Sequence, residues 1–192
     1  MYPIQLRPLH QYSMSDEEFY EFCQNNNHLK FERTKDKVII IMANTGGKTG
    51  IFNAELVTEL TLWNRQHRFG KVFDSSTAFR LPNGAVRSPD AAWVALVRWD
   101  KLTSEEQEKF PPLCPDFVAE IMSPSDLLKD AQEKMSEWME NGCQLAWLFQ
   151  PSEQLAWIYR SSQPVEIVQG FSVTFSGEEV LTGFTFDLSL LG

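Results

Sequence analysis

The chain has 192 residues, of which 43% are hydrophobic and 12% aromatic, which suits one compact domain and is too short for two well-packed ones. Its formal net charge of −9 argues against a broad basic surface that binds nucleic acid over many phosphates, although it leaves room for a local basic cleft. No stretch approaches the roughly 18 unbroken apolar residues of a membrane span, so no membrane association is expected.

Local signals divide the chain into alternating helices and strands. Ser15 and Glu18 match a capping box, and Gly70 stands where the second helix is expected to end. An Asn-Gly pair at 83–84 marks a tight turn, and Gly142 marks another helix end. In chain order we expect a helix (16–24), a hairpin (29–43), a loop (44–50), a helix (51–68), two strands (71–81 and 89–97), a short surface helix (103–110), a strand (116–122), a helix (124–142) and four short strands from residue 143 that lead into a polar tail.

This order of elements predicts an α/β or α+β domain with a mixed sheet flanked by helices. Without a repeat or linker, residues 1–192 are expected to form one domain, with an N-terminal helix and hairpin (1–45), a core (46–150) and C-terminal strands (151–192). The three cysteines lack metal-ligand spacing, and the N-terminus lacks a basic segment followed by an apolar one. Reduced thiols, a cytoplasmic location and no signal peptide are therefore expected.

Two carboxylates stand out because they fall in or beside predicted strands. Alternation places Asp116, Val118 and Glu120 on one face of the strand at 116–122. Charged groups are rarely buried unless they are paired or bind a metal. Asp90 follows Pro89 at the start of another strand. If the two strands are neighbours, Asp90 and Glu120 would repel unless one is protonated or a cation lies between them, and Mg²⁺ fits that requirement.

A lysine falls on the apolar stripe of the helix that follows Glu120. Helical spacing aligns Leu127, Ala131, Lys134 and Trp138. From there an ammonium could reach the end of the strand that carries Glu120 and stabilise negative charge developing at phosphorus. In the simpler interpretation Lys134 pairs with Asp130, or its stem covers Trp138 while the ammonium stays in water. Spacing alone leaves both interpretations open.

Several segments together resemble a known family. RLPNGAVRSPDAAWV (80–94), CPDFVAEIMSPSD (114–126) and QEKMSEWMENGCQLAWLFQP (132–151) resemble the Uma-two family of restriction-endonuclease-like proteins, which is similar to the PD-(D/E)XK nucleases. The resemblance also takes in MANTGGKTGIFNAEL (42–56) and LTGFTFDL (181–188), so it covers most of the chain. It implies a restriction-endonuclease-like mixed sheet flanked by helices, in agreement with the order of elements.

The resemblance also implies an activity and a site. The activity would be metal-dependent hydrolysis of DNA phosphodiester bonds with Mg²⁺ or Mn²⁺, and a homodimer is expected by analogy. Asp90 and Glu120 would be catalytic metal ligands, with the carbonyl of Ile121 as a further ligand. The lysine expected two residues after Glu120 is replaced by Met122, and Lys134 on the next helix matches its alternative position. Asp116 follows a proline too, but it shares a strand with Glu120 and so cannot supply the second carboxylate.

Four further residues are candidates with an equally ordinary interpretation. By the same resemblance Glu55 is a possible additional acidic residue, or else a solvent-facing helix residue. Arg80 and Arg87 flank the Asp90 turn and are possible nucleic-acid contacts, or else surface charges. Lys48 lies in a segment similar to a phosphate-binding loop, but Met42 occupies the place of the required glycine, so nucleotide hydrolysis is not favoured. Two interpretations of this segment remain: it is a flexible connection, or it is a helix N-terminus that touches a substrate phosphate.

The sequence is also compatible with a second class of function, that of a binding module. The acidic balance and the missing strand lysine are also compatible with a catalytically weak or inactive nuclease-fold module that binds nucleic acid or a protein partner.

Overall fold

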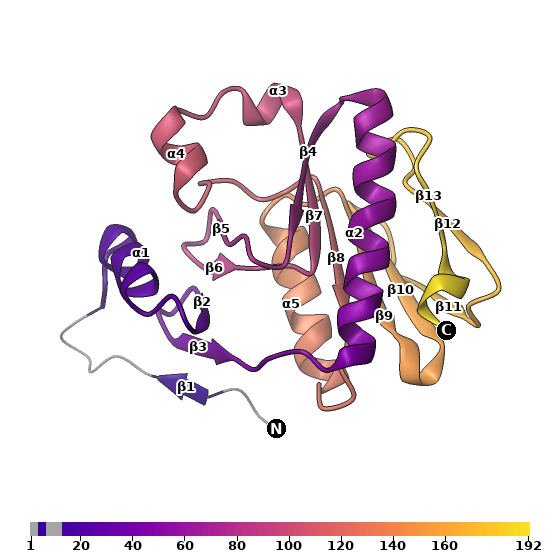
Figure 1. Ribbon diagram of the computed structural model, residues 1–192, viewed down its shortest axis with the longest axis horizontal. Helices are drawn as coiled ribbons and strands as arrows, with labels where there is room; N and C mark the ends of the chain where they lie inside the picture. Colours follow the sequence, from indigo (N-terminus) through magenta and orange to yellow (C-terminus); the bar gives the residue numbers. More distant parts are fainter. Residues whose placement is uncertain (1–3, 7–12) are drawn as a thin grey trace.

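A six-stranded mixed sheet lies at the centre of the molecule (Figure 1). In the computed structural model, which describes residues 4–6 and 13–192, the strand order is β11-β10-β9-β8-β7-β4. The β8–β9 pair is parallel and the other pairs are antiparallel. The strands are β4 (Gly70–Asp74), β7 (Ala91–Ala95), β8 (Phe117–Ile121), β9 (Leu145–Gln150), β10 (Leu155–Arg160) and β11 (Glu166–Gln169). The predicted fold class, a mixed sheet flanked by helices, is confirmed.

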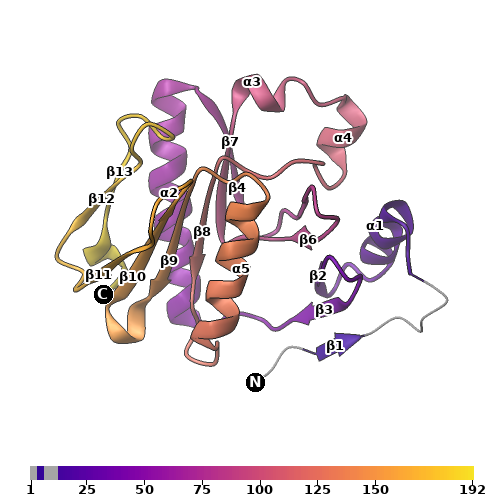
Figure 2. The ribbon, with the colours of Figure 1, turned by 180° about the vertical axis from the view of Figure 1, so that it is seen from behind.

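One long helix covers each face of this sheet. Helix α2 (Gly47–His67) packs on one face, and Figure 2 shows α5 (Leu128–Glu140) on the other. Strand β8 serves both layers because its side chains alternate. Phe117, Ala119 and Ile121 lie in the core on the α2 side, and Val118 lies in the core on the α5 side. The predicted division of this strand into two faces is correct, and it places Glu120 beside α5.

A second, antiparallel sheet is built largely from the N-terminal segment. Its order is β1 (Ile4–Leu6), β3 (Ile39–Met42), β2 (Lys30–Arg33), β6 (Val86–Arg87) and β5 (Phe79–Arg80). Helix α1 (Asp16–Asn25) starts at the Ser15 capping box and buries Phe19 in a small core with Phe31. The predicted helix at 16–24 and the hairpin at 29–43 are confirmed. Since β6 is followed by only three residues before β7, this sheet lies close to the start of β7.

The second helix begins earlier than expected, and the residue that ends it is not Gly70. The segment 44–50 is not a loop throughout, because α2 begins at Gly47, with the Gly50 N–H bonded to the Gly46 carbonyl. At the other end Arg68 takes the left-handed conformation that caps the helix, and Gly70 opens β4 instead. Glycine is required at position 70 for another reason: a Cβ there would lie 2.2 Å from the Val94 carbonyl oxygen.

Two expected strands are also shorter than the sequence suggests. The strand predicted at 71–81 ends at Asp74, and its last residues form β5 in the second sheet. The strand predicted at 89–97 ends at Ala95, because helix α3 (Leu96–Trp99) follows at once. The short helix α4 (Ser104–Glu108) is capped by Thr103, in agreement with its prediction.

The C-terminal segment is not the polar tail that the sequence suggests. It forms η1 (Pro151–Glu153), β12 (Thr174–Ser176), β13 (Thr185–Asp187) and η2 (Leu188–Leu191) around the strands of the main sheet. From residue 171 onward, seven of its apolar side chains are buried: Phe171, Phe175, Leu181, Phe184, Phe186, Leu188 and Leu191. Together with α2 they cover the aromatic ring of Trp147 on one sheet face. The expectation of a polar tail is wrong, because Phe184, Phe186 and Leu188 alternate with polar residues as a half-buried strand does.

Residues 1–3 and 7–12 lie outside the described part of the chain, and with them part of the segment on which the expectation of no signal peptide rests. Among the residues that are described, no helix has the length and apolar character needed to cross a membrane.

Candidate active site

Asp90 and Glu120 are brought together by the β7–β8 pairing. The antiparallel register pairs Ala91 with Ala119, so the next position of the ladder places Asp90 opposite Glu120. The two strands are neighbours, as predicted. Asp90 is held by two donors: the Ile121 N–H lies 2.8 Å from one carboxylate oxygen and the Asn53 amide 3.1 Å from the other. Burial nevertheless raises the pKa of Asp90, because these hydrogen bonds offset the lost hydration only in part.

Glu120 is an incompletely compensated carboxylate. Its Oε1 lies 2.8 Å from Nζ of Lys134 and accepts a hydrogen bond of 3.0 Å from Nε1 of Trp138. Burial raises the pKa of Glu120 to about 7; the charge of Asp90 acts in the same direction, and Lys134 opposes both. No hydrogen bond to Oε2 is found among the described residues. The site therefore retains an oxygen that can accept a further donor or a cation.

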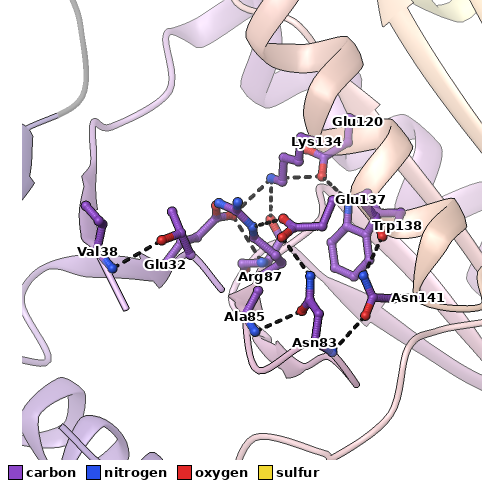
Figure 3. A network of polar contacts seen from close by, with 12 residues as sticks. Glu32, Val38, Asn83, Ala85, Arg87, Glu120, Lys134, Glu137, Trp138 and Asn141 are labelled. Atoms are coloured by element: carbon purple, nitrogen blue, oxygen red, sulfur yellow. Dashed lines mark hydrogen bonds and ion pairs between the residues drawn. The ribbon is translucent and has the colours of Figure 1, made fainter. Parts of the chain in front are cut away.

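Lys134 lies inside this site and not on the helix surface. Its ammonium contacts Glu120 at 2.8 Å, Glu32 at 2.9 Å and the Ser88 carbonyl oxygen at 3.1 Å (Figure 3). Burial disfavours the charge, but the two carboxylates outweigh it and raise the pKa of Lys134 above its usual value. Pairing with Asp130, the simpler interpretation, is therefore not what the structure contains. The predicted stripe is wrong only at Leu127, which precedes α5 and is exposed.

Glu32 is a member of the site that sequence reasoning missed. It comes from β2, in the second sheet, and is only 2% exposed. Its Oε1 also accepts the Ser88 N–H at 3.1 Å, and its Oε2 contacts Arg87 at 3.0 Å. Although burial acts in the opposite direction, Lys134 and Arg87 lower the pKa of Glu32 to about 2. The available signal was an acidic residue within a strand of the predicted hairpin. The sequence alone, however, does not show which distant residues pair with it.

The three basic residues considered as nucleic-acid contacts differ in their surroundings. Arg87 is 13% exposed and is paired with Glu32 and with Glu137, the latter at 2.5 Å. These contacts argue for a structural role of Arg87. Arg80 is partly exposed and pairs with Asp16 at 2.8 Å. Lys48 is exposed in the first turn of α2, and no ion pair of its side chain is found among the described residues.

The helix side chain that reaches Asp90 is Asn53, not Glu55. Within the described part of the chain Glu55 makes no hydrogen bond or ion pair, so its possible role as an additional acidic residue stays a prediction. Asn53 precedes Leu56 by one helical turn, and Leu56 and Leu60 lie on the buried face of α2. Helical spacing could therefore have selected Asn53.

The donors present fit a hard divalent cation. The described residues contain no cluster of three His, Cys, Asp or Glu side chains arranged around a common point. Mg²⁺, however, commonly uses only one or two carboxylates and keeps several waters. Asp90 and Glu120 supply two carboxylates, and the Asn53 Oδ1 beside them is buried without a hydrogen-bond partner. Because Asp90 only accepts, the amide of Asn53 must point its nitrogen at Asp90, which leaves Oδ1 available.

The main sheet, with one long helix on each face, is similar to the fold of a solved structure. The crystal structure of a protein from Anabaena variabilis ATCC 29413, described as "a putative nuclease belonging to DUF820", has a TM-score of 0.71 to this chain at 21% sequence identity. The similarity covers 84% of this chain and 88% of the other.

The sequence itself places the chain in a family. The Uma2 family profile, described as "Putative restriction endonuclease", matches residues 16–189. The chain belongs to this family, as its sequence motifs indicate, and family and fold together support a nuclease. No protein with a curated description matches the chain.

Proposed function

We propose that the protein is a metal-dependent endonuclease that hydrolyses phosphodiester bonds of DNA. The observation that carries the proposal is the contact of 2.8 Å between the Lys134 ammonium and Glu120, on the strand next to Asp90. Two carboxylates can hold a metal ion and a lysine can stabilise negative charge at phosphorus, which suits phosphodiester hydrolysis, and here helix α5 would supply the lysine that β8 lacks. Membership of a family described as restriction endonucleases supports the same assignment.

Each residue has a distinct role in this proposal. Asp90 and Glu120, with the Ile121 carbonyl, would hold Mg²⁺ or Mn²⁺. When bound, the ion polarises a phosphate oxygen and lowers the pKa of a coordinated water. Lys134 places a positive charge where negative charge develops on the phosphoryl oxygens. Trp138 orients Glu120 through its indole N–H.

The surroundings of the site bear on the substrate. DNA is the proposed substrate, with Arg80 and Lys48 as exposed contacts to its phosphates. The net charge of −9 restricts this attraction to the neighbourhood of the site, so few phosphates are contacted and the affinity is expected to depend only modestly on salt. A homodimer in the cytoplasm completes the proposal, because cleavage of both strands is commonly performed by paired nuclease domains.

The test is cleavage of a panel of plasmid, linear and single-stranded DNA with Mg²⁺ or Mn²⁺, comparing the wild type with Asp90→Ala. Cutting that requires metal and is lost in Asp90→Ala supports the proposal. Full metal-dependent cutting by Asp90→Ala would contradict it.

Two observations favour a second function, that of a nuclease-fold module which binds nucleic acid or a protein partner with little turnover. Oε1 of Glu120 is already occupied by Lys134 and Trp138, and Met122 stands at the usual lysine position. Calorimetric titration with Mn²⁺ separates the two functions. Binding that Glu120→Ala abolishes indicates the endonuclease, and DNA affinity indifferent to metal and to Glu120 indicates the module.

A further inference from the structure

Lys134 differs from an ordinary buried ion pair because it has two carboxylate partners from different sheets. Glu120 on β8 contacts Nζ at 2.8 Å, and Glu32 on β2 contacts it at 2.9 Å. The Ser88 carbonyl accepts the third hydrogen bond at 3.1 Å. An ammonium has three protons, so each is used, and the direction of the side chain is fixed from three sides.

The Ser88 acceptor is itself held in place. The Ser88 N–H bonds to Glu32, and the Ser88 hydroxyl donates to the carbonyls of Ser75 and Thr77, both at 2.8 Å. Glu32 is in turn held by Arg87. The Glu32 and Ser88 contacts to Lys134 thus form one rigid unit that does not depend on Glu120.

Breaking a buried ion pair is normally costly, because it leaves one charge without a partner. Here neither member is left alone if the Lys134–Glu120 contact opens. Lys134 keeps Glu32 and the Ser88 carbonyl, and Glu120 keeps the indole N–H of Trp138 at 3.0 Å. The carboxylate of Glu120 can therefore exchange its lysine partner for another cation while the lysine stays at the site.

We propose that Glu32 is a positioning residue of the reaction: it holds Lys134 in the site and so leaves Glu120 available as a ligand. The inference rests on the proposed function for its catalytic meaning. Glu32 touches neither substrate nor metal and acts through Lys134. It also makes β2 of the second sheet part of the catalytic unit, although Asp90 and Glu120, the proposed metal ligands, belong to strands β7 and β8 of the main sheet or directly precede them.

The anchoring is tested without metal, DNA or turnover, by nitrogen-15 NMR of the lysine ammonium groups. Lys134 is assigned through the signal missing in Lys134→Arg, and exposed Lys129 on the same helix serves as the reference. We expect Glu32→Gln to speed exchange of the Lys134 ammonium protons with water by about tenfold or more, since a hydrogen bond between charged groups is lost. Glu120→Gln should change this rate by less than about threefold, because the rigid unit remains.

A matched control is Glu137→Gln. Glu137 also pairs with Arg87 in the same network, but it does not contact Lys134, so the exchange rate should stay at the wild-type value. If Glu32→Gln does not fold, Glu32→Asp keeps the charge while shortening its reach, and it should give the same faster exchange. An unchanged rate in the Glu32 variant, a larger effect in Glu120→Gln, or a wild-type rate equal to that of Lys129 would overturn the inference.

Kinetics then test the catalytic meaning. With the cleavage assay, Glu32→Gln should lower kcat by about tenfold or more with KM unchanged, whereas Glu137→Gln should leave both unchanged. In the Lys134→Met background the Glu32→Gln change should have almost no further effect, because its route through Lys134 is gone. An equal loss in that background would overturn the positioning role. A wild type that neither cuts DNA nor binds Mn²⁺ would refute the proposed function, and the NMR comparison would still decide the anchoring.

Discussion

The two ends of strand β8 carry one carboxylate each on the same face, yet their surroundings differ. Asp116, just before the strand, is 2% exposed and accepts hydrogen bonds from Arg98, Gln144 and the Ala95 N–H, each at 2.8 Å. Glu120, at the other end, has both of its donors on one oxygen and stands opposite a second carboxylate, Asp90.

The difference separates a fully paired, structural carboxylate from the one proposed to hold a metal ion. Asp116 has partners on both oxygens, so it ties α3, β7 and β9 to the start of β8. Glu120 keeps an unfilled oxygen, and burial raises its pKa to about 7. A bound cation would stabilise the ionised form of a buried carboxyl with an unfilled oxygen, such as Glu120. Asp116 already has partners on both oxygens, so a cation would add little stabilisation there. The predictions below test this contrast.

The largest effect is expected from Glu120→Ala. Loss of a metal ligand should abolish Mn²⁺ binding in a calorimetric titration and reduce DNA cleavage by about 10³-fold or more. Asp116→Ala is the comparison at the other end of the strand, and it should still bind Mn²⁺ under conditions in which it is folded. Equal loss of binding in both variants would remove the distinction between the two ends.

Lys134→Met should have the next largest effect. It removes a charge from the site while keeping a side chain of similar length, and we expect kcat to fall by about 10²-fold. Circular dichroism checks that α5 is retained. Lys129→Met, an exposed lysine of the same helix, should cut like the wild type. Unchanged cutting by the Lys134 variant would return this lysine to a purely structural role.

Asp116→Ala should act on stability. It leaves the Ala95 N–H and Arg98 without an acceptor, which we expect to lower the free energy of unfolding by about 2 kcal/mol, since Arg98 is partly exposed. Urea denaturation measures this change. Glu120→Ala should cost less stability or even increase it, because it removes repulsion from Asp90. The reverse order would contradict the contrast between the two ends.

The smallest effect concerns Asp16, a partly exposed carboxylate with strong cationic partners. Burial acts to raise its pKa, but hydrogen bonds from Arg33 and Arg80 outweigh it and lower the pKa to about 2. A lowered folded-state pKa contributes stability above the unfolded value of 3.8, and this is lost as the pH falls toward 2.

After allowance for solvent screening, the Asp16 contribution is about 1 kcal/mol. Urea denaturation at pH 5 and pH 2.5 should therefore show Asp16→Asn less stable than the wild type at the higher pH, with a clearly smaller difference at the lower. A difference that stays constant across this range would show that ionisation of Asp16 is not its source.

Much of the site follows from local pattern. Strand alternation places Glu120 on the α5 face, and helical spacing places Lys134 one turn before Trp138. The resemblance to a nuclease family identifies Asp90 as the second carboxylate of the site. Its position opposite Glu120 depends on how the two strands pair. The same helical spacing could have identified Asn53 instead of Glu55, because Asn53 precedes buried Leu56 by one turn.

Other parts could not be predicted, for physical reasons. The contacts of Glu32 with Lys134 and Arg87 join distant parts of the chain, and no local period encodes such a pairing. The burial of Leu181 and Leu191 depends on the shape of the surface that they cover and follows no local period, whereas Phe184, Phe186 and Leu188 alternate as in a strand. Gly70 was misread because its requirement comes from Val94 and Trp93, on another strand.

The contact between Glu32 and Lys134 also has a consequence for biosynthesis. Its two halves are made far apart in time, since Glu32 leaves the ribosome well before α5 has been synthesised. Contacts of this sequence separation form only after the intervening loop has closed. A partly synthesised chain that has folded its N-terminal hairpin therefore has no assembled site. Under the proposed function, hydrolytic activity would therefore appear only after α5 has been synthesised and packed on the core.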